Sequence, residues 1–72
     1  MDTYWNRASS GLRTADAHGR AWRIAKDAST GRWMVYRLAK GLEPHYNAWE
    51  GWEVVAGLDT LREAKQAVEG MG

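Results

Sequence analysis

The chain of 72 residues contains no cysteine, no phenylalanine and a single proline, Pro44. Without cysteine it can form neither a disulfide nor a thiolate metal site, which is typical of proteins from a reducing cytosol. Its two histidines, His18 and His45, do not have the spacing of a zinc site. It also has no hydrophobic run long enough to cross a membrane and no basic-then-apolar leader. We therefore expect a soluble, cytoplasmic protein without a metal or cofactor.

The residues of common catalytic sites are missing as well. No serine lies at a strand-to-helix elbow, and neither histidine has a matched carboxylate, so both are expected to be solvated loop residues. Glu50 and Glu53 are three residues apart on an extended segment, which points them to opposite faces rather than at one substrate. No glycine-rich phosphate loop is present. These absences predict that the protein is not an enzyme.

Five tryptophans are what the chain has instead. Tryptophan buries a large apolar area and carries an N–H that requires a partner. A single core in so short a chain supplies only roughly 3–5 kcal/mol of net stability. Aromatic packing and self-association are the remaining means of adding to it, so the tryptophans indicate either the core or a contact surface.

Charge is unevenly distributed along the chain, although the net charge is only +1. Residues 1–40 contain eight Lys or Arg and three Asp or Glu, whereas residues 41–72 contain two and six. The two halves either neutralise each other within the fold or form surfaces of opposite sign. Such surfaces could meet between copies or leave the basic one open to an acidic partner.

The segments 20–27 and 32–40 are rich in aromatic and β-branched residues and predict a β-hairpin. Gly31 suits the left-handed position that closes a type I turn with a bulge. If Ala28 lies opposite Arg32, then Arg23 lies opposite Arg37. That register assigns one face, the expected core, to Trp22, Ile24, Met34, Tyr36 and Leu38, and the other face to Ala21, Arg23, Ala25, Trp33, Val35 and Arg37.

Residues 49–56 predict a third strand, with Gly51 at a bulge or bend and Trp52, Val54 and Ala56 on the core face. A helix is predicted over residues 60–70 because Thr60 and Glu63 form a capping box. The expected apolar stripe of this helix is Leu61, Ala64, Ala67, Val68 and Met71.

The fold class expected from these elements is α+β. A three-stranded antiparallel sheet is packed by one C-terminal helix (βββα). Residues 1–18 are expected to form an N-terminal arm and residues 19–72 the domain.

The open face of the hairpin carries the candidate site. Like charges directly opposite each other, as expected for Arg23 and Arg37, are destabilising unless an anion lies between them. Glu53 on the third strand could supply that anion; alternatively the anion belongs to a partner, a phosphate backbone or an acidic protein patch. The candidate partner-binding or nucleic-acid-binding residues are Arg20, Arg23, Arg32, Trp33, Val35 and Arg37.

Two further tryptophans are candidates for intermolecular contact. Trp5 lies in the arm and either docks onto the domain or contacts another molecule; its lack of local support favours the second. Trp49 follows Pro44 and Tyr46 in an aromatic loop, where it is either core or an exposed contact hot spot.

Residues 31–37, the third strand and residues 57–67 together resemble the arm-type DNA-binding domain of phage tyrosine recombinases. The resemblance covers about residues 19–70 and is mostly architectural. It implies a three-stranded sheet with a C-terminal helix that lays its open face into the DNA major groove. The matching face residues would be Arg23, Trp33, Val35 and Arg37.

The chain also resembles the short accessory proteins of actinobacterial phages, which often bind a host protein. We therefore expect a small, non-enzymatic, phage-encoded protein in the cytoplasm of a bacterial host. Its expected partner is a host protein or a second copy of itself, bound through the open sheet face and the arm. The alternative is a DNA-binding module that uses the Arg/Trp face; the net charge of +1 is low for that function.

Overall fold

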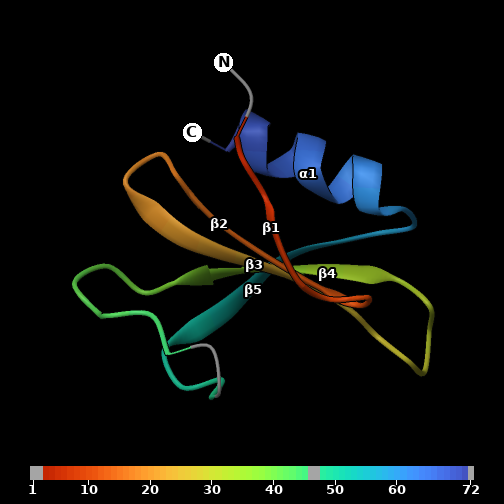
Figure 1. Cartoon of the computed structure of the whole chain (residues 1–72), viewed down its shortest axis with the longest axis horizontal. Helices are drawn as coiled ribbons and strands as arrows, with labels where there is room; N and C mark the ends of the chain where they lie inside the picture. The colour runs from red at the N-terminus through yellow and green to blue at the C-terminus, as the bar shows by residue number, and fades with distance from the viewer. Residues whose placement is uncertain (1–2, 46–47, 72) are drawn as a thin grey trace.

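The computed structural model, which describes residues 3–45 and 48–71, forms one antiparallel sheet covered on one side by a helix (Figure 1). The five strands follow one another across the sheet in chain order. Helix α1 packs against β3, β4 and β5, and we call that side of the sheet the helix face and the other the outer face. The elements are β1 (Asn6–Ser9), β2 (Leu12–Ala17), β3 (Arg20–Lys26), β4 (Trp33–Leu38), β5 (Trp52–Leu58) and α1 (Leu61–Gly70).

The expectation of three strands preceded by an arm is wrong, because residues 6–17 form two additional strands of the same sheet. β2 pairs with β3 along its whole length, and β1 adds a short edge. A two-residue hairpin turn joins β2 to β3. His18 and Gly19 have φ values of 54° and 72°, the left-handed pair that a two-residue hairpin turn requires.

The predicted start of the helix is confirmed, and so is the burial of the central residues of its apolar stripe. The Thr60 hydroxyl accepts a hydrogen bond of 3.1 Å from the Glu63 backbone N–H, as a capping box requires. Ala64 and Val68 are fully buried against the sheet, whereas Met71, at the end of the predicted stripe, is exposed.

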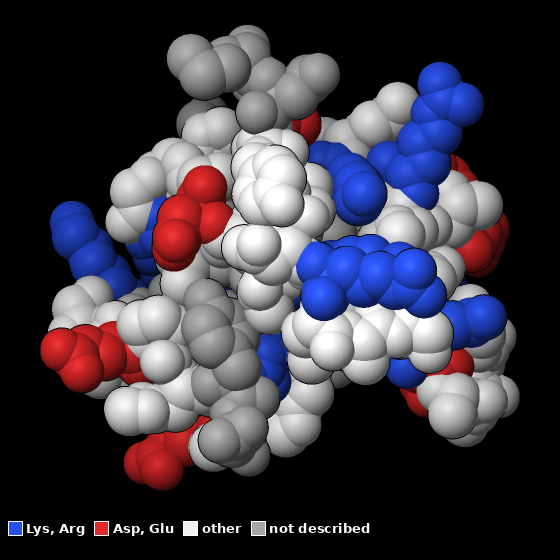
Figure 2. Space-filling model, in the orientation of Figure 1, with Lys and Arg blue, Asp and Glu red and all other residues white. Residues whose placement is uncertain are grey.

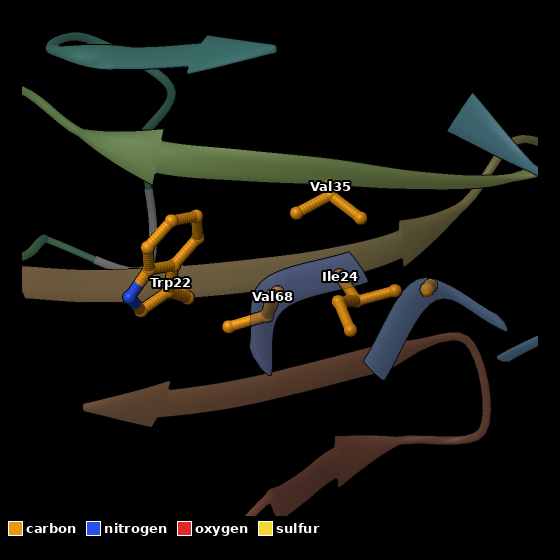
Figure 3. Close-up of a cluster of buried hydrophobic side chains, with 5 residues drawn as sticks. Trp22, Ile24, Val35 and Val68 are labelled. Atoms are coloured by element: carbon orange, nitrogen blue, oxygen red, sulfur yellow. The ribbon is translucent and has the colours of Figure 1, made fainter. Parts of the chain in front are cut away.

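The core on the helix face consists of aliphatic side chains beside a single buried indole (Figure 3). Trp22 donates a hydrogen bond of 2.8 Å to the carbonyl of Ala17, which satisfies its N–H inside the core. Full burial of a side chain such as Ile or Val contributes about 1.5–3 kcal/mol. The core residues are Trp22, Ile24, Val35, Ala64 and Val68.

The β3–β4 register differs by one residue from the expected one. Arg23 lies opposite Tyr36 rather than Arg37, and Ile24 lies opposite Val35. The hairpin is closed by Asp27 and Arg32, whose backbones are joined by a hydrogen bond of 2.8 Å from the Asp27 N–H to the Arg32 carbonyl. Since side chains alternate with a period of two, a slip of one residue moves every β4 side chain to the other face.

The Asp27 carboxylate explains why the β3–β4 loop begins at residue 28 and not at the expected residue 29. It accepts hydrogen bonds from the Ser29 N–H at 3.0 Å, the Ser29 hydroxyl at 2.8 Å and the Thr30 hydroxyl at 3.1 Å. These bonds fix residues 28–31 as a four-residue loop. Gly31 has a φ of 75°, so its predicted left-handed conformation is confirmed.

The shifted register changes which residues share a face. Trp33 and Val35 lie under the helix with Trp22 and Ile24, while Tyr36 and Leu38 lie on the outer face. The expected core positions of Met34, Tyr36 and Leu38 beneath the helix are therefore wrong. Trp52 pairs with Leu38 and Val54 with Tyr36, so these two β5 residues also leave the expected core face.

We predict that Asp27→Ala lowers the free energy of unfolding and makes it less dependent on acid pH. The hydrogen bond from the Ser29 N–H, followed by those of the Ser29 and Thr30 hydroxyls, lowers the pKa of Asp27 from its ordinary value of 3.8. A carboxyl with a depressed folded-state pKa stabilises the fold above its unfolded pKa. That contribution is lost as the pH falls through the folded value.

Urea unfolding of the wild type, Asp27→Ala and Asp27→Asn at several pH values between neutral and strongly acidic would measure this effect. Asp27→Asn is the matched control, because it keeps an acceptor oxygen but cannot titrate. Equal pH dependence below the ordinary pKa in all three proteins would contradict the assignment.

Candidate binding surface

Arg23 occupies the centre of the outer face and is only 1% exposed. Its guanidinium carbon lies 4.1 Å from the centroid of the Trp49 ring and 4.5 Å from that of Trp52. A guanidinium stacks favourably on aromatic faces because the ring quadrupole attracts the cation, and the attraction grows when water is excluded. The two indoles therefore give a buried charge an environment that stabilises it.

Hydrogen bonds join the same guanidinium to the segment between β4 and β5. Arg23 Nη1 donates to the carbonyl of Ala48 at 3.3 Å, and Nη2 donates to that of His45 at 3.2 Å. A buried cation without such partners would be strongly destabilising. Arg23 thus both needs this segment and holds it against the sheet.

Three large hydrophobic side chains of β5 and of the segment before it remain exposed. Leu42 is 53% exposed, Trp49 is 52% and Val54 is 55%. Tyr36 connects two of them, because its ring centroid lies 4.6 Å from that of Trp49 and it lies opposite Val54 across the β4–β5 pair. We call Tyr36, Leu42, Trp49 and Val54 the outer-face patch.

Leu42 reaches this region because the backbone turns sharply before β5. Gly51 has a φ of 83°, and a Cβ added there would lie 2.6 Å from Leu42 Cδ1 and 3.5 Å from Leu38 Cδ1. Only glycine combines that conformation with so close an approach. The predicted bend at Gly51 is confirmed, and it positions Leu42 beside the β4–β5 pair.

The six residues proposed from sequence for an Arg/Trp face do not form one surface. Arg23 is buried on the outer face, while Trp33 and Val35 belong to the helix face, with Val35 fully buried. The prediction that these residues share an open face is therefore wrong, because it depended on the incorrect register.

The remaining arginines of that set have partners within the chain. Arg37 Nη2 lies 2.9 Å from Glu53 Oε1 on the neighbouring strand, so the alternative in which Glu53 supplies the anion is confirmed for Arg37. Arg20 donates two hydrogen bonds to the Leu38 carbonyl, at 2.7 and 3.2 Å. Arg32 donates to the Gly57 carbonyl at 2.6 Å and lies 3.5 Å from Asp59.

Trp33 nevertheless lies between cations, although not those expected. The Arg13 guanidinium carbon is 5.9 Å from the centroid of its ring, and Lys26 Nζ is 5.8 Å from it. Arg13 comes from β2, which was expected to be part of the N-terminal arm. The arginine also donates to the carbonyls of the β1–β2 turn, the shortest of these bonds being 2.7 Å to Ser9.

The two tryptophans considered for contacts differ in their surroundings. Trp5 is half-buried and packs against the helix-face core, so its expected lack of local support is wrong. Its neighbour Tyr4 is 78% exposed instead. Trp49, for which core and contact were both considered, stacks on Arg23 with half of its side chain still exposed. Tyr46, predicted to be part of the aromatic loop, lies outside the described residues.

Nothing in the described part of the chain indicates a metal site, since no three His, Cys, Asp or Glu side chains there are grouped to hold an ion. Within residues 3–45 and 48–71, no helix has the length and apolar character needed to cross a membrane. His18 lies exposed in the turn between β2 and β3, as expected, and its Nε2 lies 3.0 Å from the carbonyl of Val68.

Comparisons of the chain with protein-family models, curated proteins and solved structures found no match. The resemblances to recombinase arm-type domains and to phage accessory proteins therefore stay predictions.

We predict that Arg23→Lys lowers the free energy of unfolding by about 1–3 kcal/mol, since lysine keeps the charge but loses the planar stack and the forked donors. Urea unfolding would measure the loss. Arg62→Lys, at an exposed position of α1, is the control and should change stability by less than about 0.5 kcal/mol. A similarly small effect of Arg23→Lys would show that the stack is not needed.

Proposed function

We propose that the chain is a non-enzymatic protein-binding module that contacts its partner through the outer-face patch. The observation that carries this proposal is the exposure of Leu42, Trp49 and Val54, each more than half accessible, on the side of the sheet that α1 leaves open. Exposed apolar side chains that adjoin one another are typical of interaction sites, whereas scattered ones are not.

Trp49 is the expected anchor of the contact. Aromatic residues contribute strongly at interfaces because they bury a large area while few torsions are fixed. The stack on Arg23 and the contact with Tyr36 already restrict the indole in the free protein. Binding would then cost little further side-chain entropy.

The charges beside the patch favour a protein over a nucleic acid. Two of the exposed apolar residues are followed in the chain by an exposed glutamate: Glu43 follows Leu42, and Glu50 follows Trp49. Figure 2 shows acidic side chains at the lower left, where Figure 1 draws the segment between β4 and β5. A phosphate backbone would be repelled here, whereas a partner with an apolar centre and a basic rim would be attracted.

The DNA-binding alternative loses the surface on which it depended, because the structure separates Arg23 from Trp33 and Arg37. It is therefore not favoured by a specific observation. Phage origin and a place in the bacterial cytoplasm are part of the same proposal but have no support from the geometry.

Photo-cross-linking in bacterial cells tests the proposal. Benzoylphenylalanine at position 49 should capture a discrete protein, whereas the same group at the exposed position Tyr4 should not. The captured protein is then purified and titrated with the wild type, Trp49→Ala and Tyr4→Ala. We expect Trp49→Ala to weaken binding at least about tenfold, as for an interface hot spot, and Tyr4→Ala to leave it unchanged.

Equal affinity of Trp49→Ala and the wild type, or no product specific to position 49, would overturn the proposal. Salt-dependent binding to duplex DNA that Trp49→Ala does not weaken would also overturn it and favour the alternative.

A further inference from the structure

The two edges of the sheet are protected to different degrees. An unpaired edge strand presents free N–H and C=O groups to any other strand, and proteins protect it by shortness, charge, proline or a bulge. β1 has four residues, all exposed and including Arg7, and its pairing with β2 is irregular. These features make β1 a poor template for another strand.

β5, the strand at the other edge, lacks most of these protections. It spans seven residues, contains no lysine, arginine or proline, and has one charge, Glu53. That charge is already engaged by Arg37 at 2.9 Å. The irregularity of the β4–β5 pairing opposite Val35 and Tyr36 is the one protective feature of β5. Val54 stands beside this edge with more than half of its surface exposed.

Nothing in the described part of the chain covers the edge. β5 is the last strand in the sheet order, and α1 packs against the face of β3, β4 and β5. In Figure 1, β5 lies on the lower side of the sheet, and the chain continues from its end to α1. Arg32 donates a side-chain hydrogen bond to the Gly57 carbonyl, near the end of the strand.

The geometry points to a second copy of this chain as the occupant: β5 pairs antiparallel with β5 of that copy and joins the two sheets into one of ten strands. This two-fold arrangement brings identical surfaces together and closes on itself. It places Val54, next to the middle of the strand, close to its counterpart. The Glu53 side chains, nearer the start of the strand, lie farther from the axis, so their repulsion is small.

A second copy fits this edge better than an unrelated strand does. The uncharged segment from Val54 to Leu58 is complementary to itself, because an apolar side chain meets an apolar one wherever the two antiparallel strands align. The chain's net charge of +1 gives little overall repulsion between copies. The dimer would also add hydrogen bonds and buried apolar area to a small domain in which eight of the described residues are buried hydrophobic ones.

The pairing is distinct from the proposed binding function, since it uses the backbone of the β5 edge. Of the outer-face patch, only Val54 lies near the two-fold axis, and Trp49, the expected anchor, takes no part in the pairing. Neighbouring antiparallel strands related by an axis perpendicular to the sheet keep the same face on the same side. The two patches would therefore lie together on one side of the ten-stranded sheet and remain open to a partner.

Sedimentation equilibrium over micromolar to millimolar concentrations would measure the association. We expect the wild type to form a dimer and Val54→Lys or Val54→Glu to raise the dissociation constant at least about tenfold, because two like charges meet near the axis. An equimolar mixture of the two variants should restore the dimer as a heterodimer. Asn6→Lys, on the opposite edge strand, is the control and should dimerise like the wild type.

Hydrogen exchange and one further variant distinguish the edge from the outer face. β5 amides should exchange more slowly at high concentration, and Trp49→Ala should still dimerise. A monomer at all concentrations would overturn the inference. Loss of the dimer in Trp49→Ala would also overturn it. So would a failure of Val54→Lys and Val54→Glu to form a heterodimer when they are mixed. Because Trp49→Ala is also the variant that tests partner binding, failure of either proposal is seen separately.

Discussion

The four-residue turn closed by Asp27 determines which side chains lie on each face of the sheet. Its carboxylate holds Ser29 and Thr30, which makes Asp27 and Arg32 the last pair of the hairpin. From this pair the register brings Val35 opposite Ile24, beneath α1. A turn closed one residue later would place Tyr36 there instead. The core and the outer-face patch are thus two consequences of one local set of hydrogen bonds.

Features set by local chemistry could be predicted from the sequence. The helix start follows from Thr60 and Glu63, and the left-handed conformation at Gly31 follows from glycine in a turn. The positions of β3, β4 and β5 were close to those observed because these segments are rich in aromatic and β-branched residues. In each case the residues that determine the structure are neighbours in the chain.

Features set by distant contacts could not be predicted in the same way. β1 has four exposed residues and no apolar alternation, so it becomes a strand only because β2 offers hydrogen-bonding groups. The candidate binding surface depends on Arg23, which donates hydrogen bonds to carbonyls more than twenty residues away. Sequence suggested that Arg23 required an anion, whereas the structure meets its charge with two indoles and backbone oxygens.

A single helix can cover one face of a five-stranded sheet, and this limit explains the outer face. The helix closes the core of Trp22, Ile24 and Val35, whereas on the opposite side Arg23 bonds to the carbonyls of His45 and Ala48, between β4 and β5. With Trp49 and Trp52 stacked on it, Arg23 is buried, while half of Trp49 stays accessible. A guanidinium at the centre requires planar and polar neighbours, so an aliphatic second core cannot form there. The same constraint that makes Arg23 a structural residue therefore keeps an aromatic surface available for binding.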